Sequence, residues 1–467
     1  MSSPAASPRI AVLGAGITGL TAAWHLQRAG LTPVVFEKGA RVGGAIGAVR
    51  SDGWLHELGP NSLLEGAASV ADFIDAAGLR ERRLYAADEA QQRYIVRGGR
   101  LVAMPASPPT FLTTGLFSWR AKLGLLGELW RPRGPHDREE SVAEFVLRRL
   151  GREFLDYAIN PFVGGVYAGD PARLSVRHGF PKLYALEREH GSLLRGAFNR
   201  RNTSGGPKGR IFSFPHGLEE LPETLATSLG AAVRRRHEVR TVSRHGADWR
   251  IEFESAGERQ TETFASVVCA LPADALAALR LEDAGPTGAL LVLRDIVHPP
   301  VASVLLGYRR ADIRHPLDGF GFLVPEVERR SLLGSLFSST LFPGRAPEGF
   351  VALTSFVGGV RSPELATRGD DALRQLVHEE LVQLVGAGAP PVFTHIHRWP
   401  RAIPQYELGY QRFKDAIASV ETASPGLFIG GNARDGISLA NCIESGRRLA
   451  DCASAFMQAR KALAAAP

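Results

Sequence analysis

The sequence predicts an α/β fold with a Rossmann-like dinucleotide-binding domain, an inserted mixed-sheet domain and a helical domain. Three observations lead to this prediction. A strand, a glycine-rich turn, a helix and a second strand follow one another in residues 10–37. A similar pattern of strand, glycine turn and helix begins at residue 427. Separate helix-like and strand-like stretches fill the middle of the chain, whose 467 residues are too many for a single core.

The opening unit has the spacing of a dinucleotide-binding βαβ motif. The apolar strand 10–13 runs into Gly14-Ala-Gly16-Ile-Thr-Gly19, and the second strand ends at Glu37. Gly14 permits the tight turn, Gly16 lets the backbone approach a pyrophosphate, and Gly19 lets the helix pack on the strand. The Glu37 carboxylate is placed to bind both hydroxyls of an adenosine ribose and would repel a 2′-phosphate.

The residues around this unit favour FAD over NAD. The helix N-terminus, which includes Ile17 and Thr18, offers N–H groups to a pyrophosphate. Directly after Glu37 comes Lys38-Gly-Ala-Arg41-Val-Gly-Gly44, a basic, glycine-containing stretch that suits a second loop over the same phosphates. The alternative is an ordinary surface turn.

Composition limits the functional class. The net charge is +7, and the chain has no dense Lys/Arg run with interleaved aromatic residues, so we expect no nucleic-acid partner. A mildly basic balance fits an anionic substrate or membrane surface. The three cysteines lack metal-ligand spacing and predict reduced residues and no metal site. The N-terminus lacks a secretory pattern and no run of 18 apolar residues occurs, so we expect a cytoplasmic protein.

The predicted domains are discontinuous. The nucleotide-binding domain is expected to comprise residues 1–86, 213–285 and 412–467. The inserted domain is expected to comprise residues 87–100, 178–212 and 286–411, and the helical domain residues 101–177. Ser141 and Glu144 have capping-box spacing at the start of a helix over 140–159, and residues 201–210 have the composition of a linker. The β-prone segments are 239–244, 249–255, 263–272, 301–308 and 350–359.

The C-terminal segment repeats the pattern of the N-terminus. Strand 427–429 is followed by Gly430, Gly431 and Gly436 and then by a helix pattern. In a flavoprotein, such a helix start directs its N–H groups at the flavin ring or the pyrophosphate. A plain βα turn is the alternative. The flavin interpretation predicts that the two ends of the chain meet on one cofactor.

Several segments resemble protoporphyrinogen oxidases, the flavoenzymes late in haem synthesis, whose class includes amine oxidases and phytoene desaturases. Segments 160–183 and 333–347 are the most specific. The other matching segments are Gly59-Pro60-Asn61-Ser62, 212–222, 319–325 and 430–442. The resemblance covers nearly the whole chain in the order of the family.

The resemblance assigns roles to individual residues. Arg93 matches an arginine that binds a substrate propionate, and Asn61 faces flavin and substrate. Gly165 lies beside the flat substrate, and Leu323, Leu336 and Phe356 match an apolar clamp around the tetrapyrrole. The remaining cofactor matches are Gly59, Pro60, Ser62, Val239 at the adenine, Trp399, Gly436, Ile437 and Ser438. Without the resemblance, these would be core, turn or surface residues.

Residues 108–130 are apolar, and in the family the corresponding helical region lies on the membrane. Phe111, Phe117, Trp119 and Trp130 are the expected interfacial anchors, and nearby basic residues suit an anionic surface. A buried helical subdomain is the alternative. A haem-pathway enzyme is a further expected partner.

The resemblance implies that flavin removes six hydrogens from protoporphyrinogen IX and that molecular oxygen reoxidises it to give hydrogen peroxide. The residues do not identify a general base or a catalytic triad. Coproporphyrinogen III stays open as the substrate, as do the amines or carotenoids of related oxidases and desaturases. A non-catalytic flavin-binding partner or chaperone is the alternative outside the enzymes.

Overall fold

The nucleotide-binding region is built on a five-stranded parallel sheet. The computed structural model describes residues 8–65, 68–135, 138–196, 199, 209–283, 285–286 and 288–465. The sheet order is β10-β2-β1-β14-β21. These strands are Val233–Arg235, Thr32–Glu37, Arg9–Leu13, Ser266–Cys269 and Leu427–Ile429, respectively. Strands from the beginning, middle and end of the chain thus share one sheet, as expected for a domain interrupted by insertions.

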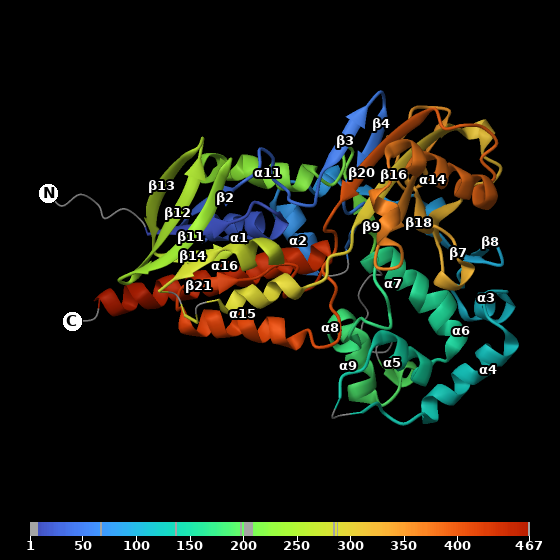
Figure 1. Ribbon diagram of the computed structural model, residues 1–467, viewed down its shortest axis with the longest axis horizontal. Helices are drawn as coiled ribbons and strands as arrows, with labels where there is room; N and C mark the ends of the chain where they lie inside the picture. Colours follow the sequence, from blue (N-terminus) through green and yellow to red (C-terminus); the bar gives the residue numbers. More distant parts are fainter. Residues whose placement is uncertain are drawn as a thin grey trace.

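Helices cover one face of this sheet, and a second sheet with helices covers the other. The first layer consists of α1 (Ile17–Arg28), α2 (Ala68–Ala76), α11 (Glu220–Leu229) and α16 (Leu439–Ala465). The second contains β11 (His237–His245), β12 (Asp248–Ser255), β13 (Glu258–Phe264) and β15 (Arg280–Glu282), with α12 (Ala273–Ala278) and α15 (Gln411–Ala423). Figure 1 shows α1 and α16 side by side, so helices from the two ends of the chain pack together.

The inserted region is a mixed seven-stranded sheet with the order β20-β16-β19-β18-β17-β7-β8. Its strands are Phe393–Trp399, Val301–Arg309, Phe350–Gly358, Leu332–Phe337, Gly319–Leu323, Gln92–Arg97 and Arg100–Ala103, respectively. Helix α14 (Asp370–Val385) packs on one face, where alternate strand residues form an apolar core. The hairpin β3 (Ala48–Ser51) and β4 (Trp54–Glu57) reaches this sheet from the nucleotide-binding region (Figure 1).

The helical region lies beside the seven-stranded sheet and the nucleotide-binding region (Figure 1). It contains α3 (Pro108–Thr113), α4 (Trp119–Leu126), α5 (Val142–Arg149), α6 (Arg152–Phe154), α7 (Asn160–Tyr167), α8 (Val176–Gly179) and α9 (Pro181–His190). Side chains between Phe180 and Leu193, which we had placed in the inserted domain, pack against the apolar core of these helices. None of the helices described is long and apolar enough to cross a bilayer.

Local sequence signals explain where several of these elements begin and end, and why some boundaries differ from those expected. The predicted capping box is present, because Ser141 and Glu144 each bond the backbone of the other. The helix expected over 140–159 is broken at Gly151, whose φ of +93° ends α5. The strand expected over 263–272 divides between β13 and β14. Residues 201–208 of the predicted linker lie outside the described part of the chain.

Candidate functional site

The first glycine-rich turn is shaped by backbone contacts that admit no side chain. Gly14 has φ of +96°, where a side chain is strained. A Cβ built on Gly19 would lie 1.9 Å from the carbonyl oxygen of Gly14. Helix α1 therefore packs directly on the end of β1, and its N-terminus is fixed at the carboxyl edge of the sheet.

Gly16 differs from its neighbours because the space before it is open. A Cβ built there would meet no atom within 4 Å, and Gly16 is the N-cap of α1 without a side-chain cap. The N-terminal N–H groups, including those of Ile17 and Thr18, are thus placed to bind a phosphate. This open cradle in front of an uncapped helix fits the pyrophosphate of a dinucleotide.

The second loop folds over the first. The Gly43 N–H donates to the Ala15 carbonyl at 2.8 Å, and a Cβ on Gly44 would lie 3.4 Å from Gly16 Cα. The Arg41 guanidinium holds this loop by donating to the carbonyls of Ile46 and Gly44, each at 2.7 Å. Arg41 therefore shapes the loop over the cradle as well as carrying charge near it.

Glu37 is preorganised at the end of β2. Its Oε2 accepts the Ala15 N–H at 3.0 Å and its Oε1 the Gly39 N–H at 2.7 Å, which leaves lone pairs for ribose hydroxyls. Lys38 is exposed beside it. Val239, the residue expected at adenine, is partly buried on β11 in the adjoining apolar core.

The C-terminal turn approaches the same place. The Gly436 N–H donates to Tyr406 Oη at 2.9 Å, and Ser438 Oγ caps α16 by accepting the Asn441 N–H at 3.1 Å. Ile437 is half-buried and packs on both the nucleotide-binding core and the helical core. A Cβ on Gly446 would lie 2.5 Å from the Thr18 carbonyl oxygen, so α16 crosses α1 closely.

The segment after β4 joins the cofactor region to the seven-stranded sheet. Gly59, Pro60, Asn61 and Ser62 are all half-buried. Trp399 Nε1, at the end of edge strand β20, donates to the Leu58 carbonyl at 2.7 Å. The structure therefore brings Trp399 beside the turn that carries Asn61, although 338 positions separate the two residues.

Strand register places the expected substrate residues on one face of the seven-stranded sheet. Arg93 pairs with Gly321, Gly321 with Leu336, and Leu336 with Thr354, while Leu323 pairs with Gly334 and Gly334 with Phe356. Leu323, Leu336 and Phe356 are half-buried and pack on apolar clusters, whereas their neighbours Phe322, Phe337 and Val357 are buried under α14 on the opposite face. We call this side of the sheet the open face.

Helix α7 borders the open face. A Cβ on Gly165 would lie 2.3 Å from Leu323 Cδ2, so a larger residue there would displace that side chain. Phe162 and Val166 are exposed on the same side of α7 as Gly165. Arg93 is exposed at the far edge, with its guanidinium 5.5 Å from the Phe320 ring centre. The open face thus joins an apolar surface to a cation.

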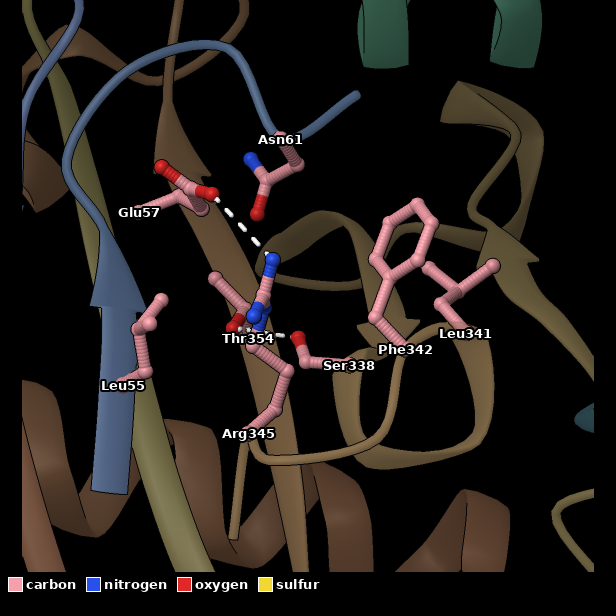
Figure 2. Close-up of a pocket in the computed structure, with 8 residues that line it drawn as sticks. All are labelled: Leu55, Glu57, Asn61, Ser338, Leu341, Phe342, Arg345 and Thr354. Carbon is pink, nitrogen blue, oxygen red and sulfur yellow. Dashed lines mark hydrogen bonds and ion pairs between the residues drawn. The ribbon is translucent and has the colours of Figure 1, made fainter. Parts of the chain in front are cut away.

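A small buried cavity lies next to Asn61 (Figure 2). Glu57 and Arg345 are 4% and 2% exposed, and their Oε1 and Nη2 atoms are 3.6 Å apart. About 10 Å³ is open to the centre of a water molecule, which is close to the room that one water needs. The remaining lining residues are Leu55, Ser338, Leu341, Phe342 and Thr354.

A histidine pair lies on the other side of β4. His56 Nδ1 is 2.6 Å from His395 Nδ1, and His56 Nε2 is 2.8 Å from Ser303 Oγ. Burial, with added repulsion from His395 and His397, lowers the pKa of His56 to about 3, so the pair is neutral at physiological pH. His395 and His397 alternate with Ile396 and therefore share the face of β20 that carries Trp399.

Sequence reasoning missed this cavity and the histidine pair. The alternation Trp54-Leu-His-Glu57 shows that two ionisable residues point to opposite sides of one strand, but it does not show what covers them. Arg345 lies within segment 333–347, which resembled the family without an assigned role. No group of three or more His, Cys, Asp or Glu side chains that could hold a metal occurs among the residues described.

Comparison with known proteins matches residues 17–454 to the family described as flavin-containing amine oxidoreductase. The chain is 34% identical over 96% of its length to protoporphyrinogen oxidase 2 of Arabidopsis thaliana, covering 94% of that protein. It is 27% identical over 94% of its length to coproporphyrinogen III oxidase of Bacillus subtilis, covering 96% of it. A crystal structure from Exiguobacterium, assigned as a protoporphyrinogen oxidase, matches 97% of this chain and 99% of its own, with TM-score 0.80 and 26% identity.

Proposed function

The chain belongs to the family of flavin-containing amine oxidoreductases, and we propose that it oxidises a porphyrinogen to the corresponding porphyrin. It is an FAD-dependent oxidoreductase. When bound, FAD supplies the two-electron chemistry, and we propose dioxygen as the acceptor that closes the cycle. The protein contributes a fixed orientation, exclusion of water and capture of carboxylate groups.

The open face is the observation that carries this proposal. Its half-buried apolar residues suit one side of a flat macrocycle, and Arg93 at the edge suits a carboxylate arm. Arg41, Trp399 and Asn61 mark the end nearest the expected cofactor. An enzyme for small amines would not need a cation at the far end of so wide a surface.

We propose roles for the remaining candidate residues on the same basis. The substrate contacts are Arg93, Asn61, Gly165, Leu323, Leu336 and Phe356. The cofactor contacts are Gly14, Gly16, Ile17, Thr18, Gly19, Glu37, Lys38, Arg41, Gly44, Gly59, Pro60, Asn61, Ser62, Val239, Trp399, Gly436, Ile437 and Ser438.

Protoporphyrinogen IX is the proposed substrate, with coproporphyrinogen III as the second candidate. Coproporphyrinogen has two more propionates and would need further cations. Arg345 is buried, is paired with Glu57 and faces a cavity with room for one water, so it does not provide such a pocket. The similarity to a coproporphyrinogen III oxidase over most of the chain keeps the second candidate in the test.

Steady-state oxidation of both porphyrinogens, followed by porphyrin fluorescence at equal flavin content, tests the proposal. We expect oxygen-dependent porphyrin formation, with higher kcat/KM for protoporphyrinogen IX. A reversed preference would move the assignment to coproporphyrinogen III. Absence of porphyrin from both substrates, with turnover of an amine, would overturn the proposed function.

We further propose that helices α3 and α4 contact an anionic membrane surface. Trp119 on α4 and Trp130 shortly after it are 63% and 76% exposed, and Leu112, Leu123 and Leu126 on the two helices are also exposed. One expected anchor is wrong, because Phe117 is buried. Phe111 is half-buried and packs against the core of the helical region. The Lys122 ammonium is turned inward onto the carbonyls of Leu112 and Thr114.

Co-sedimentation with anionic liposomes tests the membrane proposal. Trp119→Glu should lower binding at unchanged flavin content, because a charge is unfavourable where an aromatic side chain enters the interface. Val392→Glu, at an exposed apolar residue of the seven-stranded region, is the matched control. Equal binding by all three proteins would contradict the membrane proposal.

A further inference from the structure

The cavity beside Asn61 combines an ionisable side chain with room for a water. Its walls come from distant parts of the chain: β4, the turn after β4, α13 (Ser338–Leu341) with the loop that follows it, and β19. Figure 2 shows the side chains of Glu57 and Asn61 on the same side of the Arg345 guanidinium. Ser338 Oγ and Thr354 Oγ1 are 2.7 Å apart at the opposite wall.

The two oxygens of Glu57 have different surroundings. Oε1 accepts the Leu218 N–H at 2.9 Å and the Ser213 hydroxyl at 3.4 Å, and it also faces Arg345. Oε2 is buried and has no hydrogen-bond partner among the described residues. A buried carboxylate oxygen without a partner is unfavourable, so either a water or a proton is expected there.

The cavity lies on the same side of the seven-stranded sheet as the proposed substrate residues. Thr354, which lines it, is the strand neighbour of Leu336 on the open face. Asn61, which also lines it, is the residue proposed to face both flavin and substrate. A water in the cavity would therefore lie beside Glu57, Asn61 and Thr354.

Burial makes the Glu57 carboxyl hold its proton more readily than an ordinary glutamate, and the charges around it modify this effect. Burial raises the pKa of its carboxyl to about 7, against the opposing effects of Arg345 and the Leu218 N–H. The other charged groups that face this pair are Glu219, which raises the pKa of Glu57, and Glu220 and Arg50, which lie near Arg345. Arg345 also donates to Ser213 Oγ and the Phe214 carbonyl, so its position does not depend on Glu57 alone.

We propose that Glu57, acting through a water in this cavity, holds the proton that leaves the substrate in each round of oxidation. This inference rests on the proposed function. Glu57 touches neither substrate nor cofactor directly and is therefore a proton-holding, positioning residue. It supplies the acid–base group that the sequence did not identify.

The proton balance of one round gives Glu57 a defined task. When bound, FAD would accept the hydride that leaves a bridge carbon in each round. The Glu57 carboxylate would take the accompanying proton and become a carboxylic acid. Because a porphyrin keeps two of the four N–H groups of a porphyrinogen, this proton comes from a pyrrole nitrogen in two rounds and from a bridge carbon in the third. In the oxidative half-reaction, dioxygen takes two electrons and two protons to give hydrogen peroxide. One of these two protons is the hydrogen nucleus that left the substrate carbon as part of the hydride. The other is the proton that Glu57 releases.

Infrared difference spectroscopy of the FAD-loaded protein during anaerobic photoreduction tests the inference without substrate. The charge added on reduction should favour the protonated carboxyl, so we expect a new carboxylic-acid C=O band in the wild type. Glu57→Gln should lack this band. Glu187→Gln is the matched control, because Glu187 is also buried and ion-paired but lies in the helical region and does not line the cavity. A band that persists in Glu57→Gln would overturn the inference.

The anaerobic rate of flavin reduction by the porphyrinogen gives a second test. In the wild type this rate should fall as pH drops through about 7, because a carboxyl that is already protonated cannot accept another proton. Glu57→Gln should be slower by about 10- to 100-fold, since general-base effects reach 10² or more and this one acts through a water. Its pH profile should be flat over this range.

A further variant keeps the test valid if Glu57→Gln folds poorly. Thr354→Val removes a hydroxyl from the cavity and keeps the shape of the side chain. It should slow flavin reduction and leave flavin content unchanged. A wild-type rate and pH profile in both variants would overturn the inference even if the porphyrinogen is a good substrate. Absence of porphyrin in all proteins would instead contradict the proposed function, and the infrared result would still decide the role of Glu57.

Discussion

The glycine cradle of the nucleotide-binding region and the open face of the seven-stranded sheet build their sites in opposite ways. In the cradle, Gly14, Gly16 and Gly19 lie within six residues of sequence, and backbone contacts set the geometry. On the open face, Arg93, Leu336 and Phe356 come from three strands and are aligned only by register. The first site is built from residues that are close in sequence, whereas the second is built from residues that strand pairing brings together.

This difference determines which substitutions matter and why. In the cradle, an added methyl group would occupy space that backbone or ligand needs. At Gly19 it would clash with the protein backbone, whereas at Gly16 it would fill the space proposed for the pyrophosphate. On the open face, consecutive residues of one strand point to opposite sides, so one position affects substrate binding and the next affects stability. The predictions below separate these two kinds of site.

The largest expected effect is loss of FAD from Gly16→Val. The built Cβ meets no protein atom within 4 Å, so the variant should fold, while its methyl groups would occupy the proposed pyrophosphate space. We expect flavin absorbance per chain to fall by at least about tenfold. Gly124→Val, on α4 with equally open space, is the control. Full flavin content in Gly16→Val would show that the phosphate lies elsewhere.

The sequence predicted the cradle well and the open face only in part. Glycine spacing and the acid at Glu37 specify a short-range geometry that any chain with this motif must adopt. The alternation in β18 and β19 shows that two faces exist, but not which one packs under α14. Leu336 was therefore assigned through family resemblance, and Glu57 was missed because its partner Arg345 lies 288 positions away.

Adjacent residues of β18 provide the next largest effect. Phe337→Ala should lower the free energy of unfolding by about 3–5 kcal/mol, because it leaves a cavity in the core under α14. Leu336→Ala, on the open face, should cost much less stability and reduce kcat/KM for the porphyrinogen. Thermal unfolding and steady-state fluorescence assays measure the two effects. If Leu336→Ala unfolds as readily as Phe337→Ala, the open face is buried in solution.

The hairpin that joins the two regions should be acid-sensitive. Because His56 has a folded pKa near 3, below its unfolded value, its contribution to stability is present above the unfolded pKa near 6.5 and is lost as pH falls. Between pH 6.5 and about pH 4 this should remove about 3 kcal/mol from the free energy of unfolding. His56→Gln should weaken this dependence, whereas the exposed His245→Gln should retain it. Urea unfolding across this pH range measures the effect. If the free energy of unfolding changed with pH by the same amount in all three proteins, the burial argument would be contradicted.

The smallest expected effect concerns Arg93, at the edge of the open face. An exposed guanidinium that pairs with one propionate should contribute about 1–3 kcal/mol, so Arg93→Ala should lower kcat/KM by about five- to 150-fold, chiefly through KM. Arg93→Lys should recover only part, because an ammonium lacks the planar fork, and high salt should bring the wild type closer to Arg93→Ala. Arg100→Ala, on the neighbouring strand β8, is the control. A wild-type kcat/KM in Arg93→Ala at low salt would move the carboxylate anchor away from this edge and leave the open face as a purely apolar surface.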